Sequence, residues 1–166
     1  MGRRAGFWHV PRSEGEPTMA EVTRVLIVDD DELFREALGI FLAEMPGVTL
    51  VGAAADGFAA LALARSTRPD VILLDVEMPG LDGFETTRLL REDPEPPRIV
   101  ICTAASRPGL DREAREAGAD AVIYKGRIEE FERALEAAVG CAPPRGSRLA
   151  RRARADEQAQ QNRQHD

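Results

Sequence analysis

Five short, mainly apolar runs recur along the chain, each bounded by polar or turn-forming residues, at positions 25–28, 48–52, 71–74, 98–102 and 121–124. Runs of this length are typical of strands that are buried on both faces inside a parallel sheet. Between the runs, apolar residues recur at helical spacing. The alternation predicts an α/β fold, with five parallel strands and helices on both faces of the sheet.

The helices are predicted from the spacing of apolar residues and from the residues at helix ends. The first helix rests on four residues at helical spacing, Leu33, Ala37, Ile40 and Phe41. Asp31 and Asp82 stand where N-cap residues are favoured. The helix at 110–117 offers few apolar residues to the core, so we expect it to be the least firmly packed. The helix that begins at Ile128 has the clearest apolar face.

This pattern places one domain at residues 22–140. We expect residues 1–21 to be a disordered extension and residues 141–166 a disordered tail rich in arginine and glutamine, because neither has a periodic apolar pattern. Only 26 residues follow Gly140, too few for a helix-turn-helix domain, so we expect no attached output domain.

Charge and composition exclude several functions. The predicted domain holds 13 basic and 23 acidic residues, a net charge of −10, which argues against non-specific nucleic-acid binding by the folded part. The two cysteines, Cys102 and Cys141, do not have the spacing of metal ligands. No apolar run approaches the roughly 18 residues of a membrane span, and no signal peptide is recognisable, so we expect a cytoplasmic protein without membrane contact.

Polar side chains follow four of the five predicted strands: Asp29 and Asp30, Asp75, Thr103, and Lys125, the only lysine in the chain. Each has an ordinary explanation by itself, as a helix cap, a turn residue, a strand residue or a solvated cation. Parallel strands, however, deliver their carboxyl ends to one edge of the sheet, where ligands bind in open α/β folds. We therefore expect these side chains to converge.

Three carboxylates at one edge would raise one another's pKa unless a cation lay among them. Oxygen ligands without histidine or cysteine favour a hard ion, and Mg²⁺ binds few carboxylates while it keeps water and phosphate oxygens. A carboxylate can also act as a nucleophile and form an aspartyl phosphate. The residues thus predict phosphoryl transfer, with Asp75 as nucleophile, Asp29 and Asp30 as metal ligands, Thr103 as hydroxyl donor and Lys125 as the phosphate-binding cation.

The sequence resembles the receiver domains of two-component response regulators over about residues 23–140. The resemblance is carried by Val-Leu-Ile-Val-Asp-Asp-Asp at 25–31, Leu-Leu-Asp-Val-Glu-Met-Pro-Gly-Leu-Asp-Gly at 73–83, Thr103-Ala104 and Lys125. The stretch at 45–57 looks most like the subfamily whose members carry a C-terminal helix-turn-helix. The resemblance implies a flavodoxin-like sheet with strand order 2-1-3-4-5.

The resemblance also implies roles and partners. Asp75 would be phosphorylated by a histidine kinase or a phosphotransfer protein. Mg²⁺ would be held by Asp30 and Asp75, by Asp29 through water, and by the backbone carbonyl of Glu77, with Thr103 as the switch hydroxyl. A phosphorylation-dependent homodimer stays open, and the output partner is not indicated.

Two positions depart from the family pattern. Gly126 follows the lysine where relatives usually have proline or a small acidic residue. Val122 stands where the family has its switch aromatic, and Tyr124 is at a different position of the same strand face. Coupling from Thr103 to an output surface is therefore expected to differ.

Three other functions stay open beside a single-domain, phosphorylation-dependent signalling switch. One is a truncated DNA-binding regulator that lacks its output domain, and another is a protein-interaction module that does not depend on phosphorylation. The third is a phosphatase with an aspartyl nucleophile, for which Glu77 would be the second acid, but the order of the motifs fits that class poorly. We do not expect a metabolic enzyme, only a domain that catalyses its own phosphorylation and dephosphorylation.

Overall fold

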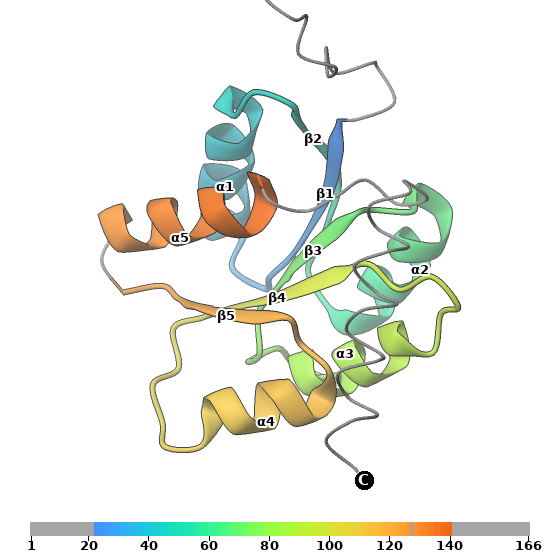
Figure 1. Ribbon diagram of the computed structural model, residues 1–166. Helices are drawn as coiled ribbons and strands as arrows, with labels where there is room; N and C mark the ends of the chain where they lie inside the picture. The colour runs from blue at the N-terminus through green and yellow to red at the C-terminus, as the bar shows by residue number, and fades with distance from the viewer. Residues whose placement is uncertain (1–21, 127, 141–166) are drawn as a thin grey trace, which may run out of the picture.

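The computed structural model describes residues 22–126 and 128–140, which form one parallel sheet with helices on both of its faces (Figure 1). The strands are β1 (Thr23–Val28), β2 (Val48–Ala54), β3 (Val71–Leu74), β4 (Arg98–Thr103) and β5 (Ala121–Tyr124). The helices are α1 (Glu32–Glu44), α2 (Gly57–Thr67), α3 (Gly83–Arg91), α4 (Leu110–Ala117) and α5 (Ile128–Gly140). The strand order β2-β1-β3-β4-β5 confirms the predicted flavodoxin-like sheet. The tails predicted to be disordered lie outside the described residues.

Alternation along the strands divides the core into two layers. Val25 and Ile27 of β1 pack on the side of α1 and α5, whereas Leu26 and Val28 pack on the side of α2, α3 and α4. The figure shows the same division, with α1 and α5 on one face of the sheet and the other three helices opposite (Figure 1). Because both faces are covered, strands of continuous apolar sequence lie inside the domain.

Aspartate caps fix where three helices begin. The side chains of Asp31, Asp56 and Asp82 accept hydrogen bonds from backbone N–H groups in the first turns of α1, α2 and α3, at 3.2, 2.8 and 2.8 Å. At α3, Glu85 also bonds back to the N–H of Asp82 and completes a capping box. The capping predicted for Asp31 and Asp82 is confirmed.

The buried face of α1 differs from the one that its apolar spacing suggests. Leu33 and Ile40, two of the four residues behind the helix prediction, are 77% and 67% exposed. The helix instead buries Leu38 and Leu42. The helix carries more apolar residues than one stripe needs, so the spacing predicts the helix without deciding which stripe faces the sheet.

Helix α4 buries only Leu110, Ala114 and Ala117, and its N-cap is Gly109, which has no side chain to cap the first turn. These three small or medium side chains agree with the prediction of a sparse interface. Within the described residues, no helix has the length and apolarity needed to cross a membrane.

Candidate functional site

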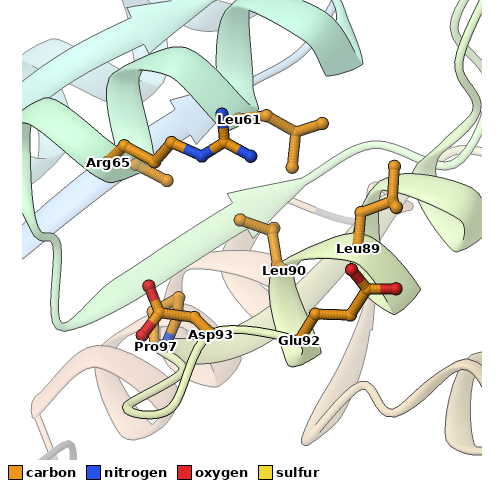
Figure 2. Close-up of a pocket in the computed structure, with 8 residues that line it drawn as sticks. Leu61, Arg65, Leu89, Leu90, Glu92, Asp93 and Pro97 are labelled. Carbon is orange, nitrogen blue, oxygen red and sulfur yellow. The ribbon is translucent and has the colours of Figure 1, made fainter.

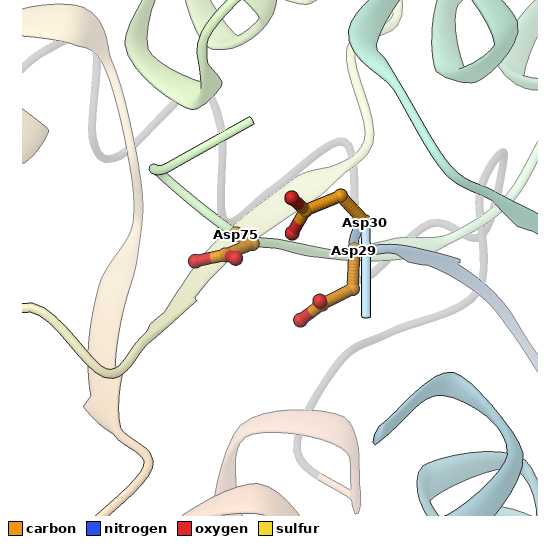
Figure 3. A group of neighbouring side chains, drawn as sticks. All are labelled: Asp29, Asp30 and Asp75. Atoms are coloured by element: carbon orange, nitrogen blue, oxygen red, sulfur yellow. The ribbon is translucent and has the colours of Figure 1, made fainter. Parts of the chain in front are cut away.

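Three carboxylates meet beyond the ends of two neighbouring strands. Asp29 and Asp30 follow β1, and Asp75 follows β3, which pairs with β1 so that Val28 lies opposite Leu74. The N–H of Asp75 donates to the carbonyl of Val28 at 2.9 Å and extends this pairing into the site. Carboxylate oxygens of the three aspartates lie within 4.8 Å of one another, and Figure 3 shows the side chains side by side. The structure thus brings together the three predicted acids.

The three acids differ in their access to solvent. Asp29 and Asp75 are 1% and 7% exposed, whereas Asp30 is exposed. Asp29 also accepts the backbone N–H of Asp31 at 2.9 Å, so one of its oxygens is held by the start of α1. A ligand that approaches from solvent would therefore meet Asp30 at the rim and the other two carboxylates below it.

Lys125 places a positive charge within this acidic cluster. It lies directly after β5, and its N–H bonds to the carbonyl of Thr103 at 2.8 Å. Its ammonium donates to Asp29 and lies 3.5 Å from Oδ2 of Asp75. With a side chain that is only 12% exposed, Lys125 partly neutralises the two buried carboxylates.

The environment of Asp75 raises the pKa of its carboxyl group above the ordinary value. Burial is the largest cause, because it disfavours the charged form. The positive charge of Lys125 opposes this rise and the negative charge of Asp29 adds to it, while the backbone N–H groups of Val76 and Glu77 lower the pKa. Asp75 is therefore a carboxylate whose charge is incompletely compensated.

Thr103 and Glu77, the other two residues predicted to contribute to the site, lie in different surroundings. Thr103 ends β4, is fully buried, and its hydroxyl oxygen accepts the N–H of Ala105 at 3.0 Å. Glu77 is exposed in the segment between Asp75 and α3, so its side chain faces solvent. Its backbone carbonyl stays a predicted metal ligand.

Gly83 contributes to the site although the residue pattern does not identify it as functional. A Cβ atom at this position would lie 2.2 Å from the carbonyl oxygen of Asp75 and 2.7 Å from Cα of Val76. The N–H of Gly83 also bonds to the carbonyl of Val76 at 3.0 Å. The first residue of α3 thus packs directly on the backbone that carries Asp75. The stretch at 73–83 that carries the family resemblance ends at Gly83, which is the one sequence signal that could have suggested it.

Phe34 is a second residue that the sequence did not single out. Its ring, on the first turn of α1, lies beneath the Lys125 ammonium, 4.0 Å from Nζ to the ring centroid. Nothing in the spacing of apolar residues separates this phenylalanine from a core residue.

The two positions that depart from the family pattern have distinct environments. Val122 is half-buried and packs with the core layer of α2, α3 and α4. Tyr124 is 40% exposed, and its hydroxyl donates to Asp111 of α4 at 3.0 Å. Tyr124 therefore links β5 to α4 at the surface and does not take the position of Val122.

A separate pocket of about 250 Å³ lies between α2 and the end of α3 (Figure 2). Leu61, Leu89 and Leu90 supply apolar surface, and Pro97 directly precedes β4. Because Thr103 lies at the other end of that strand, the pocket opens at the opposite edge of the sheet from the three acids. None of the predicted site residues lines it.

The donor set of the acidic cluster fits Mg²⁺. It consists of carboxylate oxygens from three residues, one of them at the solvent rim, and oxygen ligands with room for water are what this ion prefers. An ion bound here would neutralise the oxygens of an incoming phosphoryl group and leave Lys125 to interact with that group from another side.

Comparison with known proteins agrees with this geometry. The family model for the response regulator receiver domain matches residues 25–136. A protein-glutamate methylesterase/protein-glutamine glutaminase of Anaeromyxobacter dehalogenans is 43% identical over 69% of this chain and 32% of its own length. The response regulator GacA of Pseudomonas aeruginosa is 40% identical over 68% of this chain and 53% of its own length. The chain therefore spans about a third to a half of these relatives.

A solved structure shows the same fold. The response regulator domain of Thermotoga maritima CheB superposes with a TM-score of 0.67 at 31% identity, over 73% of this chain and 96% of that domain. The residues matched by the family model, 25–136, include Asp29, Asp75 and Lys125.

Proposed function

Since the chain belongs to the family of response regulator receiver domains, we propose that it is a phosphoryl-accepting signalling switch with Asp75 as the acceptor. The observation that carries the proposal is the cluster of Asp29, Asp30 and Asp75 with the ammonium of Lys125 among them. This arrangement holds a nucleophilic carboxylate beside oxygen ligands for Mg²⁺ and beside a compact cation for phosphate.

The donor would be a phosphohistidine of a histidine kinase or a phosphotransfer protein. An oxygen of Asp75 attacks the phosphorus, and a P–O bond forms as the P–N bond breaks. The electron pair of the P–N bond stays on the imidazole nitrogen, which takes up a proton. Asp30, Asp75 and the carbonyl of Glu77 would hold Mg²⁺, with Asp29 acting through water.

Lys125 and Thr103 have different tasks in this proposal. Lys125 exchanges its contact with Asp75 for a phosphoryl oxygen, because a flexible side chain can follow the new charge. The hydroxyl of Thr103 donates to another phosphoryl oxygen. That movement would pull on Ala105, whose N–H bonds to Thr103, and so reach the segment before α4.

The wider setting is also a proposal. We place the chain in a cytoplasmic two-component system in which it acts as a switch and not as a metabolic enzyme, although the domain promotes its own phosphorylation and dephosphorylation. A homodimer formed on phosphorylation stays a prediction.

The proposal is tested by incubation with a small-molecule phosphodonor and Mg²⁺, followed by intact-mass measurement. Wild-type protein should gain one phosphoryl group, and EDTA should prevent the gain. Lys125→Arg should label more slowly, because the planar guanidinium is larger and less mobile than an ammonium. A wild-type protein that stays unmodified with small-molecule donors and with histidine kinases would support the phosphorylation-independent interaction module instead.

A further inference from the structure

An aromatic ring lies against the Lys125 ammonium. Two of its neighbours are the carboxylates of Asp29 and Asp75. On another side lies the ring of Phe34, with Nζ 4.0 Å from the centroid. An ammonium has three N–H donors, and the negative face of an aromatic ring attracts a cation that has lost its water.

One ring contact and one hydrogen bond of the neighbouring residue hold Phe34 in place. Phe131 of α5 and Phe34 form an edge-to-face pair, with centroids 5.7 Å apart and planes at 70°, an arrangement that aromatic pairs prefer. The next residue, Arg35, donates to the carbonyl of Asp29 at 2.6 Å and ties the first turn of α1 to the end of β1. The position of the Phe34 ring beside the acidic cluster is therefore fixed.

We propose that Phe34 is a positioning residue for phosphoryl transfer, whose ring holds the Lys125 ammonium on the side of the acceptor carboxylate. The inference rests on the proposed function and extends it to a residue outside the acidic cluster. Lysine suits the site because its ammonium moves on a flexible stem, but that same freedom would let it turn towards solvent. The ring limits the freedom: it excludes water from one side of the ammonium without offering a competing hydrogen-bonding group.

Because Lys125 is the only lysine of the chain, its position can be observed directly. Protein grown with isotope-labelled lysine gives one set of side-chain NMR signals. In the wild type, the protons on the ε carbon should be shifted upfield of those in free lysine by the ring current of Phe34. Phe34→Leu should abolish that shift, and Phe34→Tyr should restore it. An unshifted signal in the wild type would overturn the inference, whatever the protein's phosphorylation.

The effect of the Phe34 ring on phosphoryl binding can be measured as the affinity for beryllofluoride, a phosphoryl analogue, in the presence of Mg²⁺. Phe34→Leu should weaken binding by roughly threefold to thirtyfold, the span expected for a partly to fully desolvated cation–π contact. Phe34→Tyr should bind like the wild type. A matched control is Phe41→Leu, since Phe41 is a half-buried phenylalanine of the same helix that packs on the same core layer. If Phe34→Leu does not fold, as judged from thermal melts, Phe34→Met serves as the ring-less variant.

A double-mutant cycle separates positioning from packing. In a Lys125→Met background, Phe34→Leu should have no further effect on beryllofluoride affinity, because the ring would act only through the lysine. An equal loss in both backgrounds, or no loss in the single variant, would overturn the inference. A wild type that does not bind beryllofluoride at all, while its lysine signal is ring-shifted, would instead contradict the proposed function.

Discussion

Replacing Asp75 by asparagine should raise the melting temperature of the metal-free protein, because it removes one of three neighbouring negative charges. Carboxylate oxygens of Asp29, Asp30 and Asp75 lie within 4.8 Å of one another. Two like charges at that separation repel by about 0.9 kcal/mol at the dielectric constant of water, and by about 3.5 kcal/mol at an effective value near 20. Asp75 experiences two such repulsions.

Lys125 offsets part of this cost. Its Nζ lies 3.5 Å from Asp75, an attraction of about 1.2 to 4.7 kcal/mol over the same range of dielectric constant. Burial of Asp75 adds to the repulsions, and it is the largest cause of the raised pKa. We expect the charged Asp75 side chain to destabilise the metal-free fold by a net amount on the order of 1 kcal/mol. Asp75→Asn should therefore melt about 3–6 °C higher for a domain of this size.

Thermal melts followed by circular dichroism, with EDTA or with excess Mg²⁺, test this balance. Mg²⁺ should stabilise the wild type by about 1.4 kcal/mol at tenfold excess over its Kd and should stabilise Asp75→Asn less. Glu136→Gln is the matched control, because Glu136 is an exposed acid in the middle of α5, and its change should leave the response to Mg²⁺ intact. A wild type that melts identically in both buffers, together with an Asp75→Asn variant that melts lower without metal, would refute the reasoning.

Three further predictions follow from burial and contact. The pKa of Asp75 is raised above its ordinary 3.8, mainly by burial, so its protonated form stabilises the folded state. That stabilisation is full below about pH 3.8 and is lost as the pH rises through the raised pKa. Urea unfolding should therefore show the stability advantage of Asp75→Asn over the wild type growing across that window, and a constant difference between the two proteins would be inconsistent with it. Gly83→Ala should cost about 1–3 kcal/mol of stability and slow phosphodonor labelling, since its Cβ would collide with the backbone of Asp75. Gly126→Ala should cost little, because a Cβ there would have no atom within 4 Å. Equal urea midpoints for the two variants would contradict this. Leu42→Ala should cost about 2–5 kcal/mol and Ile40→Ala far less, and the reverse order would show that the buried face of α1 has been misassigned.

The sequence predicted the order of elements because each strand is a short apolar run, and because α1 and α3 each begin at an aspartate cap. Asp31 and Asp82 illustrate this, since capping depends on residues within one turn of the helix. The convergence of Asp29 and Asp75 could also be expected, because parallel strands bring their carboxyl ends to one edge. The confirmed predictions therefore depend on signals within single elements and on one general rule of sheet topology.

The parts that sequence reasoning missed depend on distances between elements. The buried stripe of α1 could not be chosen from spacing alone, because Leu33 and Ile40 form as regular a pattern as Leu38 and Leu42. Phe34 matters because α1 brings its ring under Lys125, which lies 91 positions further along the chain. Contacts of this kind leave no periodic trace in a sequence.

The most direct test of the account is to locate the phosphoryl group on the chain. After incubation with a phosphodonor and Mg²⁺, borohydride reduces an aspartyl phosphate to homoserine, and peptide mass spectrometry then identifies the converted residue. The account predicts homoserine at position 75 in the wild type and no conversion in Asp75→Asn. Conversion at Asp29 or Asp30 in the wild type, or undiminished phosphoryl incorporation in Asp75→Asn, would contradict it.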